Sequence, residues 1–269
     1  MASGIDYAVA GPLTGLGAAR WAVGSDDPVA VCWPVHGLVI QPDQARTLGL
    51  PEQRFAENQI RPAARLLEIL TQLDPAPVDV ARPPERRVVG TCRHFAVLAC
   101  ALLRGRGIAS RVRCGFATYF QPEQGLDHWI VEYDADGRWV RVDPEVLGGS
   151  VVDRPQDLRP GQFLSGGEAW VAYREGRIDA STFGVYGTDN WGPAEIRGNA
   201  VKDLAALNKV EMLPWDEWGR MTASYEGRTG AEYDELIDVV AEVCAGDDTA
   251  AMAALYESED LAVPTELIH

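Results

Sequence analysis

The stretch Gly90-Thr91-Cys92-Arg93-His94-Phe95-Ala96-Val97-Leu98 places a cysteine at the predicted start of a helix. Thr91 is a suitable N-cap and Gly90 frees the turn before it, so the helix is predicted to begin near Thr91. A thiol at this position meets the positive end of the helix dipole and the N–H groups of the first turn, which favour the nucleophilic thiolate. We therefore interpret Cys92 as a candidate nucleophile. The alternative, a small buried residue, is what we expect of the other cysteines: Cys32, Cys100, Cys114 and Cys244.

A predicted hairpin further along the chain brings a histidine and an aspartate to neighbouring strand ends. The strands Trp129–Tyr133 and Arg138–Val142 flank Asp134-Ala135-Asp136-Gly137, which has the composition of a hairpin turn. His128 stands directly before the first strand and Asp143 directly after the second.

The register of this hairpin decides how close the two side chains lie. A four-residue loop would pair Tyr133 with Arg138 and set His128 directly opposite Asp143 on one face, whereas a register shifted by two would leave them diagonal neighbours. An aspartate beside a histidine fixes the ring's tautomer and stabilises the imidazolium, as the third member of a catalytic triad does. The alternative interpretation is a polar pair at the strand ends without a catalytic role.

The rest of the sequence alternates between helical and extended patterns. A helix is predicted to open at Pro62, with apolar residues at helical spacing through Leu73, and the prolines between residues 74 and 85 indicate a linker. The N-terminal region is predicted to be rich in strands and turns, with apolar stretches at 29–33 and 38–40. The further predicted elements are a strand at 111–120 and helices at 199–210 and 231–244.

The composition indicates an acidic globular protein. The 269 residues include 24 Lys and Arg against 40 Asp and Glu, which gives a formal net charge of -16. Such a surface repels nucleic-acid phosphates and anionic lipids, so neither nucleic acid nor a membrane is an expected partner. The hydrophobic content of 46% excludes wholesale disorder, and no apolar run reaches the roughly 18–20 residues of a membrane span. The stretch Met1 to Arg20 carries Asp6 and no basic leader, so no signal peptide is expected.

The cysteines and histidines form no metal-site pattern. Five scattered cysteines fit reduced thiols in the cytoplasm better than a disulfide scaffold. No CxxC or HxxxH pair occurs, and no acidic loop has the spacing of a calcium site. The sequence therefore predicts a cytoplasmic protein with no metal and no other cofactor.

The blocks around Cys92, His128 and Asp143 together resemble the transglutaminase-like superfamily in their order and local context. The resemblance covers roughly residues 60–146. It implies a papain-like α+β fold, in which a helix presents the nucleophile against an antiparallel sheet. The blocks that carry the resemblance are Gly90–Leu98, Ala101–Arg104, Gly107–Val112, Asp127–Tyr133 and Arg138–Pro144.

The resemblance also suggests a division of the chain. Residues 1–146 would form the transglutaminase-like core, with N-terminal strands and a helix. Residues 147–269 would form a mostly helical C-terminal extension packed on that core. The region from Ser150 on resembles the tail of a group of bacterial transglutaminase-like proteins. The oligomeric state is left open.

The resemblance implies a triad in which Cys92 is the nucleophile, His128 is the general base and acid, and Asp143 orients the imidazole. The implied activity is acyl transfer through a thioester on a small amide, a peptide or a carrier-protein-bound acyl group, with net hydrolysis. One alternative is an amide-forming acyl or aminoacyl transferase of a biosynthetic pathway. Another is a non-catalytic member that binds a peptide or a partner protein.

Further residues are candidates for contacts with the substrate and the transition state. The family often supplies a second oxyanion donor from an upstream side chain, and Gln59, Asn58 and Trp33 are the candidates here. The alternative for Gln59 is an exposed polar residue before a helix. His94 is either a substrate contact or a first-turn residue with a packing role, and Tyr119 is either part of a cleft wall or an aromatic strand end.

Overall fold

The computed structural model describes residues 4–18 and 25–268 and has an α+β architecture, as predicted. Part of the N-terminal stretch in which no signal peptide is expected, residues 1–3 and 19–20, lies outside the described residues. No helix in the described part of the chain is both long enough and apolar enough to cross a membrane.

Two compact units share the chain, and we name each after its candidate site residue. The predicted boundary at residue 146 rests on family resemblance and not on compactness, so it stays a prediction. The Cys92 unit comprises residues 6–18, 25–112 and 130–158, and the His128 unit comprises residues 4–5, 113–129 and 159–268.

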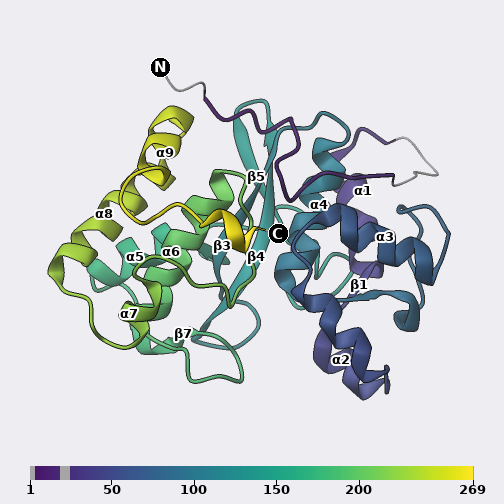
Figure 1. The fold of residues 1–269 in the computed structure, drawn as a ribbon, viewed down its shortest axis with the longest axis horizontal. Helices are drawn as coiled ribbons and strands as arrows, with labels where there is room; N and C mark the ends of the chain where they lie inside the picture. The colour runs from purple at the N-terminus through teal and green to yellow at the C-terminus, as the bar shows by residue number, and fades with distance from the viewer. Residues whose placement is uncertain (1–3, 19–24, 269) are drawn as a thin grey trace. The chain divides into compact units, whose positions relative to one another are not determined.

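The Cys92 unit carries short helices and two small pieces of sheet (Figure 1). Its α1 and α3 both contact α4. Strands β3 and β4 also continue into the His128 unit. The elements are α1 (Pro28–Cys32), β1 (Val39–Ile40), α2 (Pro42–Thr47), α3 (Ala63–Leu73), β2 (Val88–Val89), α4 (Cys92–Arg104), β3 (Ser110–Ala117), β4 (Gly125–Ala135) and β5 (Arg138–Val142).

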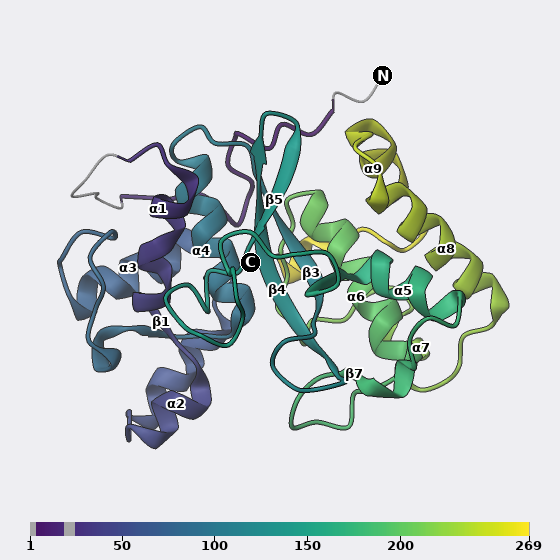
Figure 2. The same ribbon diagram turned by 180° about the vertical axis from the view of Figure 1, so that it is seen from behind.

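The His128 unit is mostly helical, and α5, α6 and α8 lie side by side in both views (Figures 1 and 2). Helix α6 also contacts β6 and β7, so it covers this end of the sheet. The helical character predicted for the C-terminal part is confirmed. Its elements are β6 (Phe163–Ser165), α5 (Gly166–Arg174), β7 (Phe183–Gly184), α6 (Pro193–Leu207), α7 (Met221–Tyr225), α8 (Ala231–Ala245) and α9 (Thr249–Tyr256).

The larger sheet has the strand order β5-β4-β3-β6, and β7 pairs with β4 in parallel. The β4–β5 hairpin is antiparallel, and Ala135 pairs with Arg138 across a two-residue turn. Asp136 and Gly137 form this turn with φ values of 53° and 87°, which is the left-handed backbone that a tight hairpin turn requires. The predicted four-residue loop, with Tyr133 paired to Arg138, is therefore wrong, and the register shifted by two is the one observed.

The helix that carries the predicted nucleophile begins where expected. Helix α4 starts at Cys92 directly after Thr91 and stops before Gly105, and all of its residues are buried. The Arg104 guanidinium donates to the carbonyl oxygen of Ser110, from Nε at 3.1 Å and from Nη2 at 2.9 Å. These bonds fasten the end of α4 to the start of β3, so within the Cys92 unit α4 packs against the sheet.

The apolar stretch 29–33, predicted as a strand, is mostly helix α1. The Asp27 carboxylate caps this helix by accepting from the N–H groups of Val29 and Ala30, at 3.4 and 3.2 Å, and Pro28 occupies the first helical position. Capping and the fixed φ of proline outweigh the strand propensity of the short apolar run. The neighbouring stretch 38–40 does contain a strand, β1.

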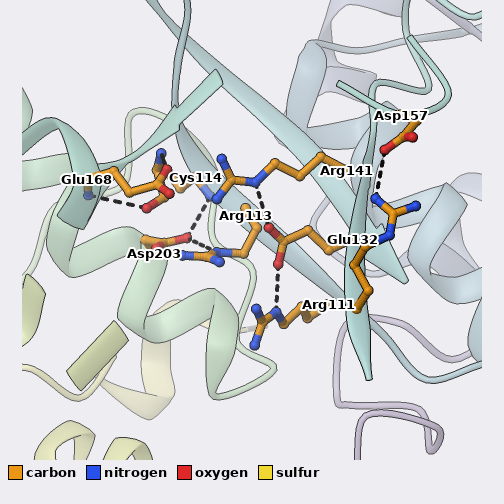
Figure 3. A network of polar contacts seen from close by, with 10 residues as sticks. Arg111, Arg113, Cys114, Glu132, Arg141, Asp157, Glu168 and Asp203 are labelled. Atoms are coloured by element: carbon orange, nitrogen blue, oxygen red, sulfur yellow. Dashed lines mark hydrogen bonds and ion pairs between the residues drawn. The ribbon is translucent and has the colours of Figure 1, made fainter. Parts of the chain in front are cut away.

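Each unit has a buried carboxylate that binds arginine (Figure 3). In the Cys92 unit, Glu132 of β4 accepts from Arg111 Nε at 2.7 Å and from Arg141 Nε at 2.9 Å. In the His128 unit, Asp203 of α6 accepts from Arg113 Nε and Nη2, at 2.9 and 2.7 Å, and from the backbone N–H of Cys114 at 3.0 Å. Because Asp203 is fully buried, this bidentate pair fixes α6 against β3.

Replacing Asp203 by Asn should destabilise the His128 unit strongly. The substitution leaves the buried Arg113 guanidinium without its countercharge, and we expect the free energy of unfolding to fall by about 3–5 kcal/mol. The matched control is Asp157→Asn, because Asp157 pairs with Arg138, whose side chain is 63% exposed, and such a pair contributes only about 0–1 kcal/mol. Urea denaturation of both variants measures the difference, and equal losses would contradict this account.

Candidate active site

Cys92 is the first residue of α4, and the chain before it is held by a parallel strand pair. Val39 and Ile40 of β1 pair with Val88 and Val89 of β2. The N–H of Gly90 extends this pairing by donating to the carbonyl oxygen of Ile40 at 3.0 Å. The turn that leads into the nucleophile helix, which we call the nucleophile turn (residues 90–92), is therefore fixed to the carboxyl end of β1.

Gly90 is required in this turn by lack of space. A Cβ atom on Gly90 would lie 2.7 Å from Cγ of His94 and 3.1 Å from Cγ1 of Val39. Both neighbours are buried, so a shift of either would disturb the packing around it. The glycine before the helix N-cap thus has a packing cause.

His94 serves the first turn of α4. Its Nδ1 accepts from the backbone N–H of Thr91 at 3.0 Å, so the ring takes the place that Glu or Gln holds in a capping box. The side chain is fully buried. Burial, together with the charge of Arg93, lowers the pKa of His94 to about 3. Of the two interpretations of His94, the geometry favours the first-turn role over the substrate contact.

Asp143 is tied to the nucleophile turn through two intervening residues. The Asp143 carboxylate accepts from the backbone N–H of Glu145 at 3.0 Å. The Glu145 carboxylate in turn accepts from Nε2 of Gln41 at 2.8 Å. Gln41 directly follows Ile40, whose carbonyl oxygen receives the Gly90 bond. Within the Cys92 unit, the structure therefore links Asp143 and Cys92 by one continuous path of contacts.

Asp143 itself is fully buried. Its backbone N–H donates to the carbonyl oxygen of Pro155 at 2.8 Å, which anchors the end of β5 on its other side. The observed hairpin register, continued by one pair, sets Asp143 opposite Ile130, and His128 lies two residues further along β4. The register that would set His128 directly opposite Asp143 is therefore wrong, and the diagonal arrangement of the two side chains stays a prediction.

His128 lies in the first half of β4, in the His128 unit, and is 3% exposed. Its imidazole packs edge-on against the ring of Phe120, with a centroid separation of 5.0 Å, and near the ring of Tyr119 at 6.2 Å. Tyr119 and Phe120 are themselves partly exposed. The loop between β3 and β4 therefore places two aromatic rings against the imidazole, and a substrate contact for Tyr119 stays a prediction.

A second carboxylate adjoins His128 in sequence but belongs to another cluster. Asp127 accepts from Nδ2 of the buried Asn199 on α6 at 2.8 Å. Burial raises the pKa of Asp127, although the charge of Lys202 and the Asn199 bond act against that rise. Because neighbouring residues of a strand point to opposite faces, Asp127 faces α6 and His128 faces away from it. Asp127 is thus no substitute for Asp143 beside the imidazole.

Glu195 is a further member of this cluster on α6. It is 2% exposed and accepts from the hydroxyl of Tyr225 at 2.8 Å. Burial raises the pKa of Glu195 to about 7. The cluster on the α6 side of the sheet therefore contains one carboxyl group, that of Glu195, whose pKa lies near neutral pH.

The predicted second oxyanion donors differ in their placement. Gln59 ends a 3-10 helix, Glu52–Gln59, and its Nε2 donates to Oδ1 of Asn58 at 2.9 Å. The buried Glu57 in this helix accepts from the N–H of Val89 at 2.8 Å, directly before the nucleophile turn. Gln59 therefore belongs to a segment anchored beside Cys92, while its exposed side chain also fits the alternative interpretation.

Trp33 lies in a different setting. Its side chain is 49% exposed and packs edge-on against His36, with ring centroids 5.5 Å apart. It lines a small cavity of about 220 Å³ together with Pro34, Asp79 and Arg106, and no residue of the nucleophile turn lines this cavity. The geometry therefore favours Gln59 over Trp33 as a donor near the thiol.

The sequence interpretation missed Gln41 and Glu145. They are 104 residues apart, and neither belongs to a motif of its own. Only the parallel pairing of two-residue strands brings Gln41 to the nucleophile turn. The sequence offered two signals. Gln41 is a polar residue directly after a short apolar strand, and Glu145 directly follows Asp143-Pro144.

The four cysteines other than Cys92 are buried, as the sequence predicts. Each is free of disulfides and buried. Burial raises the pKa of Cys32 and of Cys114 above the usual thiol range. No group of three or more His, Cys, Asp or Glu residues suited to hold a metal ion occurs within residues 4–18 and 25–268.

Comparison with known proteins relates this geometry to a family. Residues 71–144, which include Cys92, His128 and Asp143, match the model of the Transglutaminase-like superfamily. No curated protein matches the sequence. Among solved structures, "a Putative Cysteine Protease from Cytophaga hutchinsonii" is 20% identical over 49% of this chain and 47% of its own, with a TM-score of 0.20. A likeness at that TM-score carries no weight, so the family match is the informative comparison.

The buried His94 should make the protein sensitive to mild acid. Unfolded chains bind a proton on histidine below pH about 6.5, whereas folded His94 stays neutral until about pH 3. The stability is thus complete above pH 6.5 and falls as the pH drops, by about 2 kcal/mol between pH 7 and 5. His94→Gln restores a standard capping box without a titrating ring. Urea denaturation at pH 7 and pH 5 gives the free energy of unfolding of each protein. Between these pH values the wild type should lose about 2 kcal/mol more than His94→Gln, and equal losses in the two proteins would contradict this prediction.

Proposed function

Since residues 71–144 belong to the transglutaminase-like superfamily, we propose that this protein is a cysteine-dependent acyl-transfer enzyme with Cys92, His128 and Asp143 as its triad. The observation that carries the proposal is the path of hydrogen bonds from the nucleophile turn through Gln41 and Glu145 to Asp143. Within the Cys92 unit, this path joins the segment of the proposed orienting carboxylate to the turn of the proposed nucleophile.

The position of Cys92 supports its role as nucleophile. Its thiol sits at the N-terminus of a 13-residue helix, where the dipole and the first-turn N–H groups favour a negative charge. It is 8% exposed, in contrast with the 0% of Cys32, Cys100 and Cys114. A nucleophile needs this combination of a stabilised anion and a remaining opening to the substrate.

The proposed reaction begins when His128 takes the proton from Sγ of Cys92. The thiolate attacks the acyl carbonyl carbon, a C–S bond forms, and the carbonyl electron pair moves to oxygen. The backbone N–H of Cys92 stabilises this oxyanion at the helix N-terminus, and Gln59 is the proposed second donor. Collapse of the oxyanion breaks the bond to the leaving group, which receives the proton from His128, and a thioester remains.

Net hydrolysis is the proposed outcome. Water attacks the thioester while His128 accepts a water proton, and the Cys92 thiolate then leaves and is reprotonated. The proposed substrate is a small amide, a peptide or a carrier-protein-bound acyl group, with Tyr119 at the wall of the substrate site. An amine in place of water would form an amide by the same steps. The product therefore depends on whether water or an amine reaches the thioester.

The proposal predicts unusual thiol reactivity at Cys92. Iodoacetamide at pH 6 should alkylate Cys92 before any of the four buried cysteines, which serve as internal controls in the same peptide mass spectrum. His128→Ala should slow the reaction at Cys92 by at least about tenfold, because a thiol pKa higher by one unit leaves about one tenth of the thiolate. Asp143→Asn should also slow the alkylation of Cys92.

Trapping completes this test. Wild-type protein incubated with activated amides, peptide esters and acylated carrier proteins should gain an acyl mass on Cys92, and the Cys92→Ser variant should form no labile thioester. The decay of the adduct is then compared in buffer alone and in buffer with an added amine. Release of the free acid indicates hydrolysis, and release of the amide indicates amide formation. A Cys92 that alkylates with an ordinary thiol pH profile and gains no acyl group would support the non-catalytic binding protein instead.

A further inference from the structure

Gln41 holds a place at the candidate site that its sequence position does not suggest. It follows the last residue of β1 and precedes α2, so its backbone is fixed on both sides. Ile40, immediately before it, pairs with Val89 and receives the bond from Gly90. The Gln41 side chain therefore starts from the strand end that carries the nucleophile turn.

Glu145 joins Gln41 to Asp143 in the path of hydrogen bonds. It follows Pro144, which restricts the backbone, and its N–H donates to the Asp143 carboxylate. Its own carboxylate is partly buried and accepts the amide N–H of Gln41. Because both groups belong to Glu145, a tilt of the segment 143–145 would move the N–H bonded to Asp143 and the carboxylate bonded to Gln41 together.

We propose that Gln41 and Glu145 are positioning residues of the triad, which hold the Asp143 carboxylate at a fixed distance from the nucleophile turn. This inference rests on the proposed function. Neither residue touches the reacting atoms in this role. They act by fixing the segment from which Asp143 orients the imidazole, where displacements of about 1 Å suffice to impair catalysis.

The polarity of the pair makes the inference testable. Gln41 is the donor and Glu145 the acceptor, and a hydrogen bond to a charged acceptor is stronger than one between neutral groups. Gln41→Glu places two carboxylates against each other and breaks the link. Glu145→Gln leaves an amide oxygen that still accepts from Gln41. The double exchange Gln41→Glu with Glu145→Gln restores an amide–carboxylate bond in the opposite direction.

The readout is the pH profile of Cys92 alkylation, because a residue with a purely structural role would not move its midpoint. Gln41→Glu should raise the midpoint by about one pH unit, which lowers the rate at pH 6 about tenfold. Glu145→Gln should stay within about threefold of the wild type, and the double exchange should recover most of the loss. The matched control is Gln44→Glu, since Gln44 is an exposed residue on the neighbouring α2 and the substitution adds the same charge.

The outcomes separate the two proposals. A wild-type profile with an ordinary thiol midpoint that His128→Ala does not change would overturn the proposed function. A depressed wild-type midpoint that Gln41→Glu leaves unchanged would overturn only the positioning role. An equal shift in Gln44→Glu would also overturn it, because the shift would then follow from added charge.

Folding of the variants is read in the same experiment. If the four buried cysteines of Gln41→Glu become reactive, that variant is unfolded and Gln41→Ala takes its place, with Gln44→Ala as control. Gln41→Ala should shift the midpoint in the same direction, because the link to Glu145 is lost without a charge clash. An unshifted midpoint in folded Gln41→Ala would overturn the positioning role.

Discussion

A single backbone hydrogen bond, from the N–H of Gly90 to the carbonyl oxygen of Ile40, holds the candidate site together within the Cys92 unit. Two strands of two residues each would not persist in isolation, and this bond carries their parallel pairing into the nucleophile turn. It sets where α4 begins, and so where the Cys92 thiol lies. It also brings Gln41 to the same place, and through Gln41 it brings Glu145 and the Asp143 segment. The lack of room for a side chain on Gly90 shows how closely the turn is packed.

Buried charged groups fix the register of the strands that lead to Asp143. Glu132 binds two arginines from adjacent strands, and Arg111 also stacks on the ring of Trp139, with its Cζ atom 3.9 Å from the ring centroid. Such groups are costly to bury unless every partner is in place, so they specify one register of β3, β4 and β5. The hairpin ends at Val142, directly before Asp143, and a slip of its register by one residue would turn the side chains of β5 to the other face of the sheet.

Local signals in the sequence predicted local structure well. Gly90 and Thr91 marked the start of α4, and the apolar spacing after Pro62 marked α3. The hairpin register followed from the backbone of Asp136 and Gly137, which composition alone left open between two turn lengths. Helix α1 was missed because Asp27 and Pro28, a cap and a first helical residue, were outweighed by an apolar run. The link between Gln41 and Glu145 depends on a contact across 104 residues, and no local pattern encodes such a contact.

The central claim is that Cys92 and His128 titrate as one system. Its most direct test is an NMR titration of the His128 imidazole in the wild type and in Cys92→Ser. A thiolate beside the ring stabilises the imidazolium, so the imidazole should titrate at a higher pH in the wild type than in the variant. Identical midpoints in the two proteins would mean that the thiol and the ring do not share a site, and would contradict the account.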